Sequence, residues 1–427
     1  MLYLKNATYI DSGTLEITTG HLGVSPDPSK GYGFQSLKPG LTQFVDAIPP
    51  DAPTIDCSGK IVTASFAIGH HHIYSALARG MPMPARFPCN FVEILEFIWW
   101  NLDKKLDAEM IRASAMVAGL EAARCGCTFI IDHHASPNAP EGSLQIIADA
   151  LDEIGLAHLL CYELSDRDGG DCLKAGLAES EAYLKHNQSL VGVHASFTVS
   201  PELLERAVGM ADDYSTGIHI HVAEDPADGR HCRETFDCSL ARRLRDAGAL
   251  ESAKSLLAHC LHLDDEEREI VRESNAWVVH NTQSNQNNNV GAFDPRGLGE
   301  RVFIGTDGMH SDMLAAARAA YLEGQAMGGL SPLEAYERMR YVHWYLGDND
   351  FQGDYDNNLV ILDYPTPTPI TSENWPAHVV YGLTSAHVHS VISDGQLIVE
   401  NGRHTFIDEE RELALAREQA ERLWKML

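Results

Sequence analysis

Short apolar runs alternate with helical segments along most of this chain, and this alternation restricts the fold more than any other feature of the sequence. The runs are rich in aliphatic and β-branched residues, and amphipathic stretches such as residues 143–154 and 201–213 separate them. The runs cover residues 61–72, 128–134, 157–163, 190–197, 217–223, 255–260, 276–280 and 301–307. Because strands that alternate with helices form parallel sheets, eight such units predict an α/β fold of the (β/α)8 TIM-barrel type over residues 61–349.

Both ends of the chain have a different pattern. Residues 1–60 and about 358–406 contain short alternating strands broken by turns such as Asp394-Gly395 and Asn401-Gly402. We therefore expect a small β-sandwich domain built from residues 1–60 together with residues 350–427, with a helix at the C-terminal end. About 55 residues separate the first run from the second, which indicates an insertion over the mouth of the barrel.

The charge of the chain limits its partners. There are 61 Asp and Glu residues against 32 Lys and Arg residues, which gives a formal net charge of −29. A surface this negative repels phosphate backbones and anionic lipids, so we expect a small-molecule substrate and neither nucleic acid nor membrane as a partner. No basic start followed by an apolar stretch and no long apolar run is present, which predicts a cytoplasmic protein. The 9 scattered cysteines include no CxxC pair and predict reduced thiols.

Histidines stand at the ends of several predicted strands, where barrel enzymes assemble their active sites. His70 and His72 close the first run, and they point to the same side because strand residues alternate between faces, while His71 points away. In the fifth run His219 and His221 share one face, and His221 lies nearer the rim. Imidazoles that share a face are natural metal ligands, although solvated histidines at a strand end remain the alternative.

Three other polar residues follow predicted strands. Glu224 comes three residues after His221, where a loop carboxylate can act as a general acid or base, unless it is an ordinary surface glutamate. His259 ends the sixth run, as a functional group or a hydrogen-bonded core residue. Asp307 ends the eighth run, and a carboxylate there is costly to bury unless it is paired or binds a metal. Three imidazoles and one carboxylate suit Zn, Fe or Mn, with positions left for water and substrate.

The order of these motifs resembles the amidohydrolase superfamily, in its branch of aminohydrolases and chlorohydrolases, and most of all the SsnA-type aminohydrolases. The matching segments include His70-His71-His72, Trp99-Trp100, residues 131–137, 161–169 and 219–224, Leu257-Ala258-His259-Cys260, Val279-His280-Asn281, Ser284-Asn285 and Gly305-Thr306-Asp307-Gly308-Met309. The chain departs from the family pattern at Ala64-Ser65, Thr282-Gln283 and Gln286, which affects the expected substrate contacts and not the metal site.

The resemblance implies a role for each candidate. His70, His72, His221 and Asp307 would bind the metal, Glu224 would shuttle protons, and His259 would orient the hydrolytic water. Dinuclear members bridge their metals with a modified lysine on the fourth strand, and residues 190–197 contain no lysine. We therefore expect one divalent metal ion per chain, Zn ahead of Fe or Mn. The resemblance also implies a homodimer or a larger homo-oligomer.

Together these features predict a metal-dependent hydrolase that deaminates an amino-substituted nitrogen heterocycle and releases ammonia. The candidate substrate contacts are His134, His194, His280, Trp100 and Ser284. A hydrolytic dehalogenase or an amidohydrolase of a cyclic substrate is the alternative within the enzymes. The alternative outside them is a catalytically silent binding protein with the same fold.

Overall fold

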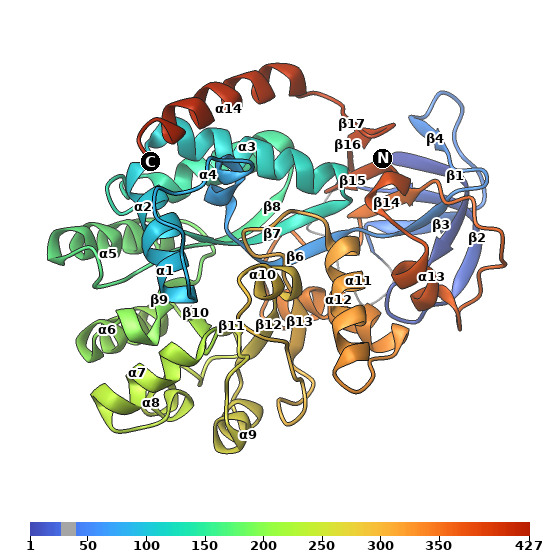
Figure 1. Cartoon of the computed structure of the whole chain (residues 1–427). Coiled ribbons are helices and arrows are strands. Elements are labelled where there is room, and N and C mark those ends of the chain that lie inside the picture. Colours follow the sequence, from blue (N-terminus) through green and yellow to red (C-terminus); the bar gives the residue numbers. More distant parts are fainter. Residues whose placement is uncertain (27–39) are drawn as a thin grey trace.

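The computed structural model describes residues 1–26 and 40–427, and its main body is a closed barrel of parallel strands with helices around it (Figure 1). The barrel strands are β6 (Phe66–His71), β7 (Cys127–His134), β8 (Ala157–Tyr162), β9 (Val191–Ala195), β10 (Ile218–Val222), β11 (Leu256–His259), β12 (Trp277–His280) and β13 (Val302–Ile304). The ladders β6–β7–β8 and β9 to β13 are all parallel. Parallel bridges between His71 and Asp307 and between Leu164 and Val193 join the two groups and close the barrel.

The helices pack around the barrel and begin where the sequence supplies caps. In α6, the Ser200 side chain accepts a hydrogen bond from the backbone N–H of Leu203, and Pro201 occupies the first turn. The outer helices are α3 (Ala108–Arg124), α4 (Ser143–Ile154), α5 (Gly170–Leu184), α6 (Pro201–Asp213), α7 (Pro226–Phe236), α8 (Leu240–Asp246), α9 (Asp265–Glu273), α10 (Thr282–Asn287), α11 (Met313–Ala326) and α12 (Pro332–Asp348). Within the described ranges, no helix is both long enough and apolar enough to cross a membrane.

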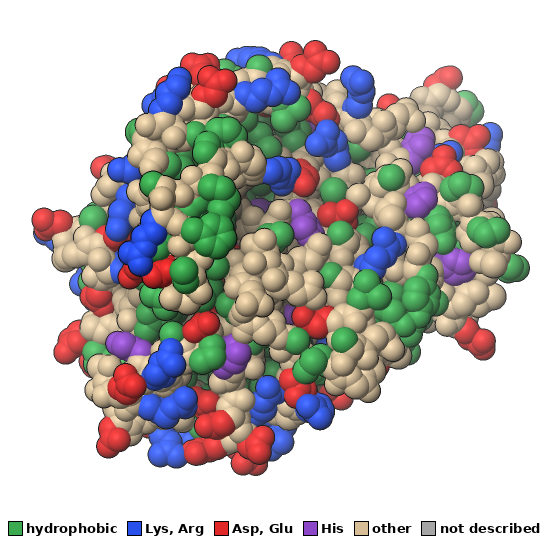
Figure 2. Space-filling model, viewed as in Figure 1, with side chains coloured by type: hydrophobic (Ala, Val, Ile, Leu, Met, Phe, Trp, Pro, Cys, Tyr) green, Lys and Arg blue, Asp and Glu red, His purple; other side chains and the backbone are tan. Residues whose placement is uncertain are grey.

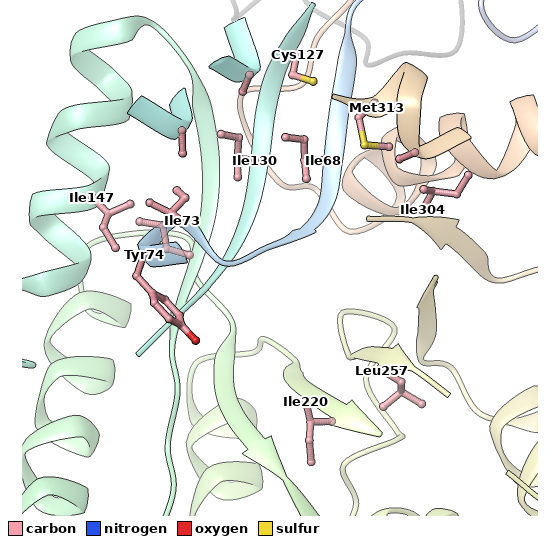
Figure 3. Packing of buried hydrophobic residues seen from close by; sticks show 14 of the residues in the cluster. Ile68, Ile73, Tyr74, Cys127, Ile130, Ile147, Ile220, Leu257, Ile304 and Met313 are labelled. Atoms are coloured by element: carbon pink, nitrogen blue, oxygen red, sulfur yellow. The ribbon is translucent and has the colours of Figure 1, made fainter. Parts of the chain in front are cut away.

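Two apolar layers hold the barrel together, one on each face of the strands. The outward-pointing Ile68, Ile130 and Ile220 pack against the helices, as Figure 3 shows for several successive strands. The inward-pointing Phe129 and Phe303 belong to a separate cluster that fills the barrel interior. Side chains at alternate strand positions therefore face either the outer helices or the barrel interior. This alternation decides which side chains at the strand ends face the mouth of the barrel.

The chain ends form the predicted β-domain. Its nine strands make one hydrogen-bonded mixed sheet in the order β17-β16-β15-β14-β5-β1-β2-β3, with β4 paired to β1. These strands are β1 (Leu2–Ile10), β2 (Ile17–Val24), β3 (Thr42–Val45), β4 (Thr54–Asp56), β5 (Ile61–Ala64), β14 (Leu359–Leu362), β15 (Val388–Ser393), β16 (Gln396–Glu400) and β17 (Arg403–His404). The helices of this region are α13 (Trp375–Tyr381) and the predicted C-terminal helix α14 (Glu409–Trp424), which crosses over α3 (Figure 1).

One strand prediction is wrong. The first apolar run, residues 61–72, is divided at Ser65, because β5 pairs with β1 and β14 in the terminal sheet while β6 enters the barrel. The buried guanidinium of Arg340 donates hydrogen bonds to the backbone carbonyls of Ala64 (3.2 Å) and Ser65 (2.6 Å). These bonds hold the chain at the point where it crosses from one sheet to the other, so a continuous apolar run serves two sheets.

The long first crossover contains short helical turns. They are η2 (Ile73–Ala78), α1 (Phe91–Ile94), the π-helical segment η3 (Leu95–Trp99), α2 (Trp100–Leu102) and η4 (Asp103–Lys105). Phe91, Leu95, Trp99 and Trp100 from these turns line the main cavity of the barrel. The predicted insertion over the barrel mouth is therefore present, and it supplies the apolar wall of the site.

Candidate metal centre and active site

A cavity opens at the carboxyl ends of the barrel strands, and its volume is about 650 Å³ including the open mouth. Figure 2 shows a hollow near the middle of this face, with histidine side chains inside it and hydrophobic side chains at its edge. The lining residues are His72, Tyr74, Ser75, Phe91, Leu95, Trp99, Trp100, Glu163, Arg167, His194, His221, Glu224, His259, Ser284, Asn287, Asn288, Asp307, Gly308 and Met309. Concave sites with apolar and aromatic walls and a few polar groups are typical of small-molecule binding.

Two histidines in this cavity present unprotonated nitrogens to each other. The Nδ1–H of His72 donates to the carbonyl oxygen of His133 at 2.7 Å, and the Nδ1–H of His221 donates to the carbonyl oxygen of His194 at 2.8 Å. A neutral imidazole with its proton on Nδ1 has a bare lone pair on Nε2, and these two Nε2 atoms lie 3.1 Å apart. Facing lone pairs repel unless a cation lies against them, so the pair fits two ligands of one metal ion.

His70 adds a third nitrogen to this centre. Its Nδ1 lies 2.8 Å from Nε2 of His219, whose Nδ1 is in turn 3.6 Å from Sγ of Cys161. The buried Nε2 of His70 has no hydrogen-bond partner among the described residues. With Nδ1 donating to His219, the orphaned Nε2 carries the lone pair that a metal ion needs, and His219 fixes the orientation of the ring.

Asp307, His259 and Glu224 complete the cluster. Asp307 Oδ1 lies 3.5 Å from His72 Nε2, and Asp307 Oδ2 lies 3.5 Å from His259 Nε2. The Nε2 of His259 is also 3.4 Å from Glu224 Oε2, and its Nδ1 is held by Asn285 Oδ1 at 2.8 Å. His259 therefore lies between the two carboxylates. The six predicted metal and catalytic residues belong to overlapping groups of three whose donor atoms lie within 4.8 Å of one another, and these donor atoms suit a divalent metal.

The two carboxyl groups have opposite pKa shifts. Burial raises the pKa of Glu224 to about 7 and outweighs the attraction of His259. Burial also acts against ionisation of Asp307, but the imidazoles of His72 and His259 and the backbone N–H of Gly308 hold its pKa below the usual value. Environments that separate the pKa values of neighbouring carboxyl groups assign one to the acid role and the other to the base role.

The backbone is strained where these residues leave their strands. Ala223, His259, Cys260 and Asp307 have positive φ angles of 49°, 76°, 53° and 55°. Non-glycine residues rarely adopt this left-handed region, and such outliers concentrate at active sites. At the carboxyl ends of β10, β11 and β13 the backbone therefore adopts an unfavourable conformation, as expected where a functional side chain must be held in one position.

The structure brings only some of the predicted substrate contacts to the cavity. Trp100, His194 and Ser284 line it, whereas His134 and His280 do not. On β7 His134 points to the helical side, where its Nε2 pairs with Ser136 Oγ at 2.9 Å. The prediction for His134 conflicts with strand alternation, since His133 is the inward-facing member of that pair.

His280 is likewise turned away from the cavity. Its ring stacks on Phe293 with centroids 4.3 Å apart, and its Nε2 contacts Glu323 on α11 at 3.1 Å and Thr282 at 2.9 Å. It continues the outward face that Val278 begins on β12. His280 therefore belongs to the packing between the barrel and its outer helices.

Sequence reasoning assigned no role to Glu163 or Arg167, and both line the cavity. Leu159 and Cys161 on β8 point into the barrel, so strand alternation carries Glu163 to the same side. Burial opposes ionisation of Glu163, but His194, His133 and Arg167 together hold its pKa well below the usual value. The alternation of inward and outward side chains along β8 could have predicted that Glu163 faces the cavity, just as the alternation along β10 predicts it for His221.

Comparison with protein families decides the affiliation of the chain. A sequence model of the amidohydrolase family matches residues 61–339, which is more than half of the chain. The chain belongs to the amidohydrolase family. The predicted superfamily is thereby confirmed, and so is the predicted enzyme class, a hydrolase of carbon–nitrogen bonds.

Curated relatives of this amidohydrolase extend over most of its length. It is 27% identical over 397 residues to the 5-methylthioadenosine/S-adenosylhomocysteine deaminase of Desulforudis audaxviator, covering 87% of this chain and 88% of that protein. It is 30% identical over 346 residues to the 5'-deoxyadenosine deaminase of Methanopyrus kandleri, covering 76% of this chain and 78% of that protein.

Solved structures confirm the predicted fold. A zinc-bound adenosine deaminase from Xanthomonas campestris has a TM-score of 0.81 at 16% identity, covering 99% of this amidohydrolase and 98% of that chain. The atrazine chlorohydrolase TrzN from Arthrobacter aurescens, complexed with zinc, has a TM-score of 0.80 at 18% identity, covering 98% and 100%. At these identities the likeness establishes the barrel with its terminal β-domain.

Proposed function

We propose that this amidohydrolase is a mononuclear zinc-dependent deaminase of adenine nucleosides, related within the family to the SsnA-type aminohydrolases. The observation that carries the proposal is the pair of anchored imidazoles, His72 and His221, whose bare Nε2 atoms face each other 3.1 Å apart beside a protonatable Glu224. The names of the two curated relatives, both deaminases of adenine nucleosides, support this substrate class.

The proposed metal ligands are His70, His72, His221 and Asp307. When bound, the divalent metal lowers the pKa of water toward about 7 and so supplies hydroxide at neutral pH. Asp307, which is ionised, accepts the proton that the water gives up. His259 holds the water in line with the substrate carbon, because Asn285 fixes its ring. Glu224 in its protonated form would donate to the ring nitrogen next to that carbon as the hydroxide oxygen bonds to the carbon. The proton held by Asp307 would pass to the amino group, which would leave as ammonia, and the proton of the added hydroxyl would return to Glu224.

The remaining cavity suits a purine with a sugar attached. Trp99, Trp100, Phe91 and Leu95 form an apolar and aromatic wall, against which a flat heterocycle can stack. His194 and Ser284 also line the cavity and offer hydrogen bonds. Trp100 lies 5.8 Å from the His194 ring, edge to face, so the two side chains hold each other in position.

An ammonia-release screen with the zinc-loaded protein tests the function. We expect ammonia from 5'-deoxyadenosine, 5'-methylthioadenosine or adenosine, and no chloride from atrazine. Chloride release without nucleoside deamination would replace the proposal with a dehalogenase. Absence of both products from a metal-replete, folded protein would favour the catalytically silent alternative.

The metal stoichiometry gives a separate prediction. We expect about one zinc per chain, because the three imidazoles and Asp307 belong to overlapping donor groups and β9 contributes no lysine to bridge a second ion. Elemental analysis of protein purified without chelators checks the number. Two tightly bound ions per chain would contradict the mononuclear reading, and iron or manganese in place of zinc would contradict only the identity of the metal.

Assembly is a further prediction. We expect a homodimer or a larger homo-oligomer, as the family resemblance implies, with a contact patch that is locally neutral despite the net charge of −29. Light scattering at micromolar concentration measures the mass. A mass of 47.0 kDa, that of one chain, would contradict the prediction.

The domain division and the location stay predictions as well. We propose a catalytic barrel over residues 61–349 and a terminal domain of residues 1–60 with 350–427, with the first boundary moved to Ser65, where β5 gives way to β6. The predicted cytoplasmic location is proposed as well. Limited proteolysis followed by mass spectrometry would test the division.

A further inference from the structure

A group of charged side chains reaches the active-site cavity through two of its members, Glu163 and Arg167. We call it the Arg167 cluster, and its members are Asp103, Lys104, Glu163, Arg167 and Asp168. The guanidinium NH2 of Arg167 contacts a carboxylate oxygen of Asp103 and lies 3.4 Å from Glu163 Oε1, and its Nε lies 2.8 Å from Asp168 Oδ2. Lys104 Nζ holds the other oxygen of Asp168 at 2.8 Å.

The cluster ties the insertion to the barrel. Asp103 and Lys104 come from η4, while Glu163, Arg167 and Asp168 follow β8. The four side chains other than Lys104 are all at most 8% exposed. Arg167 also lies over the Trp100 ring, 5.2 Å from its centroid, so it supports the aromatic wall of the cavity.

The positive charge of Arg167 is fully matched within the cluster. Two cations, Arg167 and Lys104, face three carboxylates, so the cluster carries a net negative charge when all five groups are ionised. Burial raises the pKa of Asp103 to about 7, and protonation of Asp103 would bring the cluster only to neutrality. In neither protonation state does the Arg167 cluster offer an excess positive charge to an anionic ligand.

No other lysine or arginine lines the cavity within residues 1–26 and 40–427. The carboxylate of Glu163, by contrast, is directed to the inside, where its oxygen lies within 4.8 Å of nitrogens of His194 and His221. Its contacts with Arg167 and with His133 Nδ1 are both 3.4 Å, longer than ordinary charge-assisted hydrogen bonds. Glu163 therefore retains acceptor capacity toward the cavity.

We propose that the Arg167 cluster makes the site selective for adenine nucleosides without an anionic group, and that Glu163 is the residue that disfavours a substrate carboxylate. This inference rests on the proposed function and refines it. The two relatives differ in this respect, since S-adenosylhomocysteine ends in a carboxylate and 5'-deoxyadenosine has none. The arrangement here places a carboxylate in the cavity and leaves no unmatched cation to receive another.

The test compares substrates that differ by a single group. S-adenosyl-3-thiopropylamine is S-adenosylhomocysteine without its carboxylate, and it has the same length and the same ammonium group. With zinc-loaded wild-type protein we expect kcat/KM for this amine to exceed that for S-adenosylhomocysteine by at least about tenfold. 5'-Methylthioadenosine serves as the substrate without a charged tail and should be deaminated efficiently.

A variant then assigns the discrimination to Glu163. We expect Glu163→Gln to reduce the ratio between the amine and S-adenosylhomocysteine by at least about threefold, because it removes the repelling charge and keeps the shape. The control Glu179→Gln removes another buried carboxylate, one on α5 that accepts backbone N–H bonds from Gly142 and Leu144 and lies outside the cavity. It should leave the ratio unchanged.

The outcomes separate the inference from the function it rests on. Equal or preferred turnover of S-adenosylhomocysteine by wild-type protein would overturn the inference while leaving nucleoside deamination intact, and it would mean that Arg167 is released to bind the carboxylate. An unchanged ratio in a folded Glu163→Gln protein would overturn the role of Glu163. If Glu163→Gln does not fold, the wild-type ratio decides alone. No ammonia from any of these three nucleosides would overturn the inference, and no ammonia from 5'-deoxyadenosine or adenosine either would overturn the proposed function as well.

Discussion

The His221→Ala protein is expected to lose its metal and to lose at least about a thousandfold in kcat/KM. His221 supplies one of the two Nε2 lone pairs at the centre of the cluster, and its Nδ1–H is held by the His194 carbonyl. Alanine offers no ligand, so only three of the four proposed ligands would remain to hold the metal. Without the metal, water keeps its ordinary pKa and supplies almost no hydroxide at neutral pH.

Elemental analysis and ammonia release on the same preparation measure this effect. His134→Ala is the matched control, because His134 is equally buried at the end of a barrel strand but points to the helical side. It should keep the metal and most of the turnover if the protein remains folded. A His221→Ala protein that still holds one tightly bound zinc per chain would remove His221 from the proposed ligands.

For Glu224→Gln we expect the opposite combination, a protein with metal and without turnover. Glutamine has nearly the same shape, and Glu224 is not among the proposed ligands, so metal content and fold should be unchanged. General acid–base groups typically contribute about 10²- to 10⁴-fold, and we expect kcat to fall by that amount. Metal content, thermal unfolding and ammonia release are the measurements.

The dependence of turnover on pH provides a second test of the role of Glu224. Glu224 acts while protonated, and burial raises its pKa to about 7, so wild-type activity should fall as the pH rises through that value. Asp307 acts while ionised, and its lowered pKa keeps it so at neutral pH, so it limits activity only on the acid side. Glu224→Gln should therefore abolish the alkaline limb. Near-normal turnover with an intact alkaline limb would mean that another residue donates the proton.

The grouping of the candidate metal ligands was largely predictable from sequence because strand alternation acts over a few neighbouring residues. On β10 the alternation alone places His219 and His221 on the inner face, while Ile220 packs outward. The same rule places Glu163 inside, and the sequence reasoning did not apply it there. It also separates His133 from His134, and the sequence analysis chose the outward-facing His134 as a candidate substrate contact.

The rule is interrupted at particular points, and only the structure shows where. In β6 the pairing register with β7 shifts between Ile68 and His71. As a result Gly69 and His70 both face the barrel interior, although strict alternation would place them on opposite faces of the strand. At the end of β11 the left-handed φ of His259 turns its side chain toward Asp307. Such irregularities depend on contacts with distant strands, which no local period encodes.

By itself the sequence determined the kinds of side chain that meet at the barrel mouth, the strands that deliver them and the chemistry open to them. The tertiary structure decided which nitrogen of each histidine faces the centre, since His72 and His221 are oriented by carbonyls of His133 and His194. The tertiary structure also decided that Arg167 forms ion pairs with three carboxylates, those of Asp103, Glu163 and Asp168. Glu163 and Asp168 follow β8, as Arg167 does, whereas Asp103 comes from the insertion. The physical reason is range: periodicity assigns a residue to a face, whereas hydrogen bonds and ion pairs are set by partners brought together from distant parts of the chain.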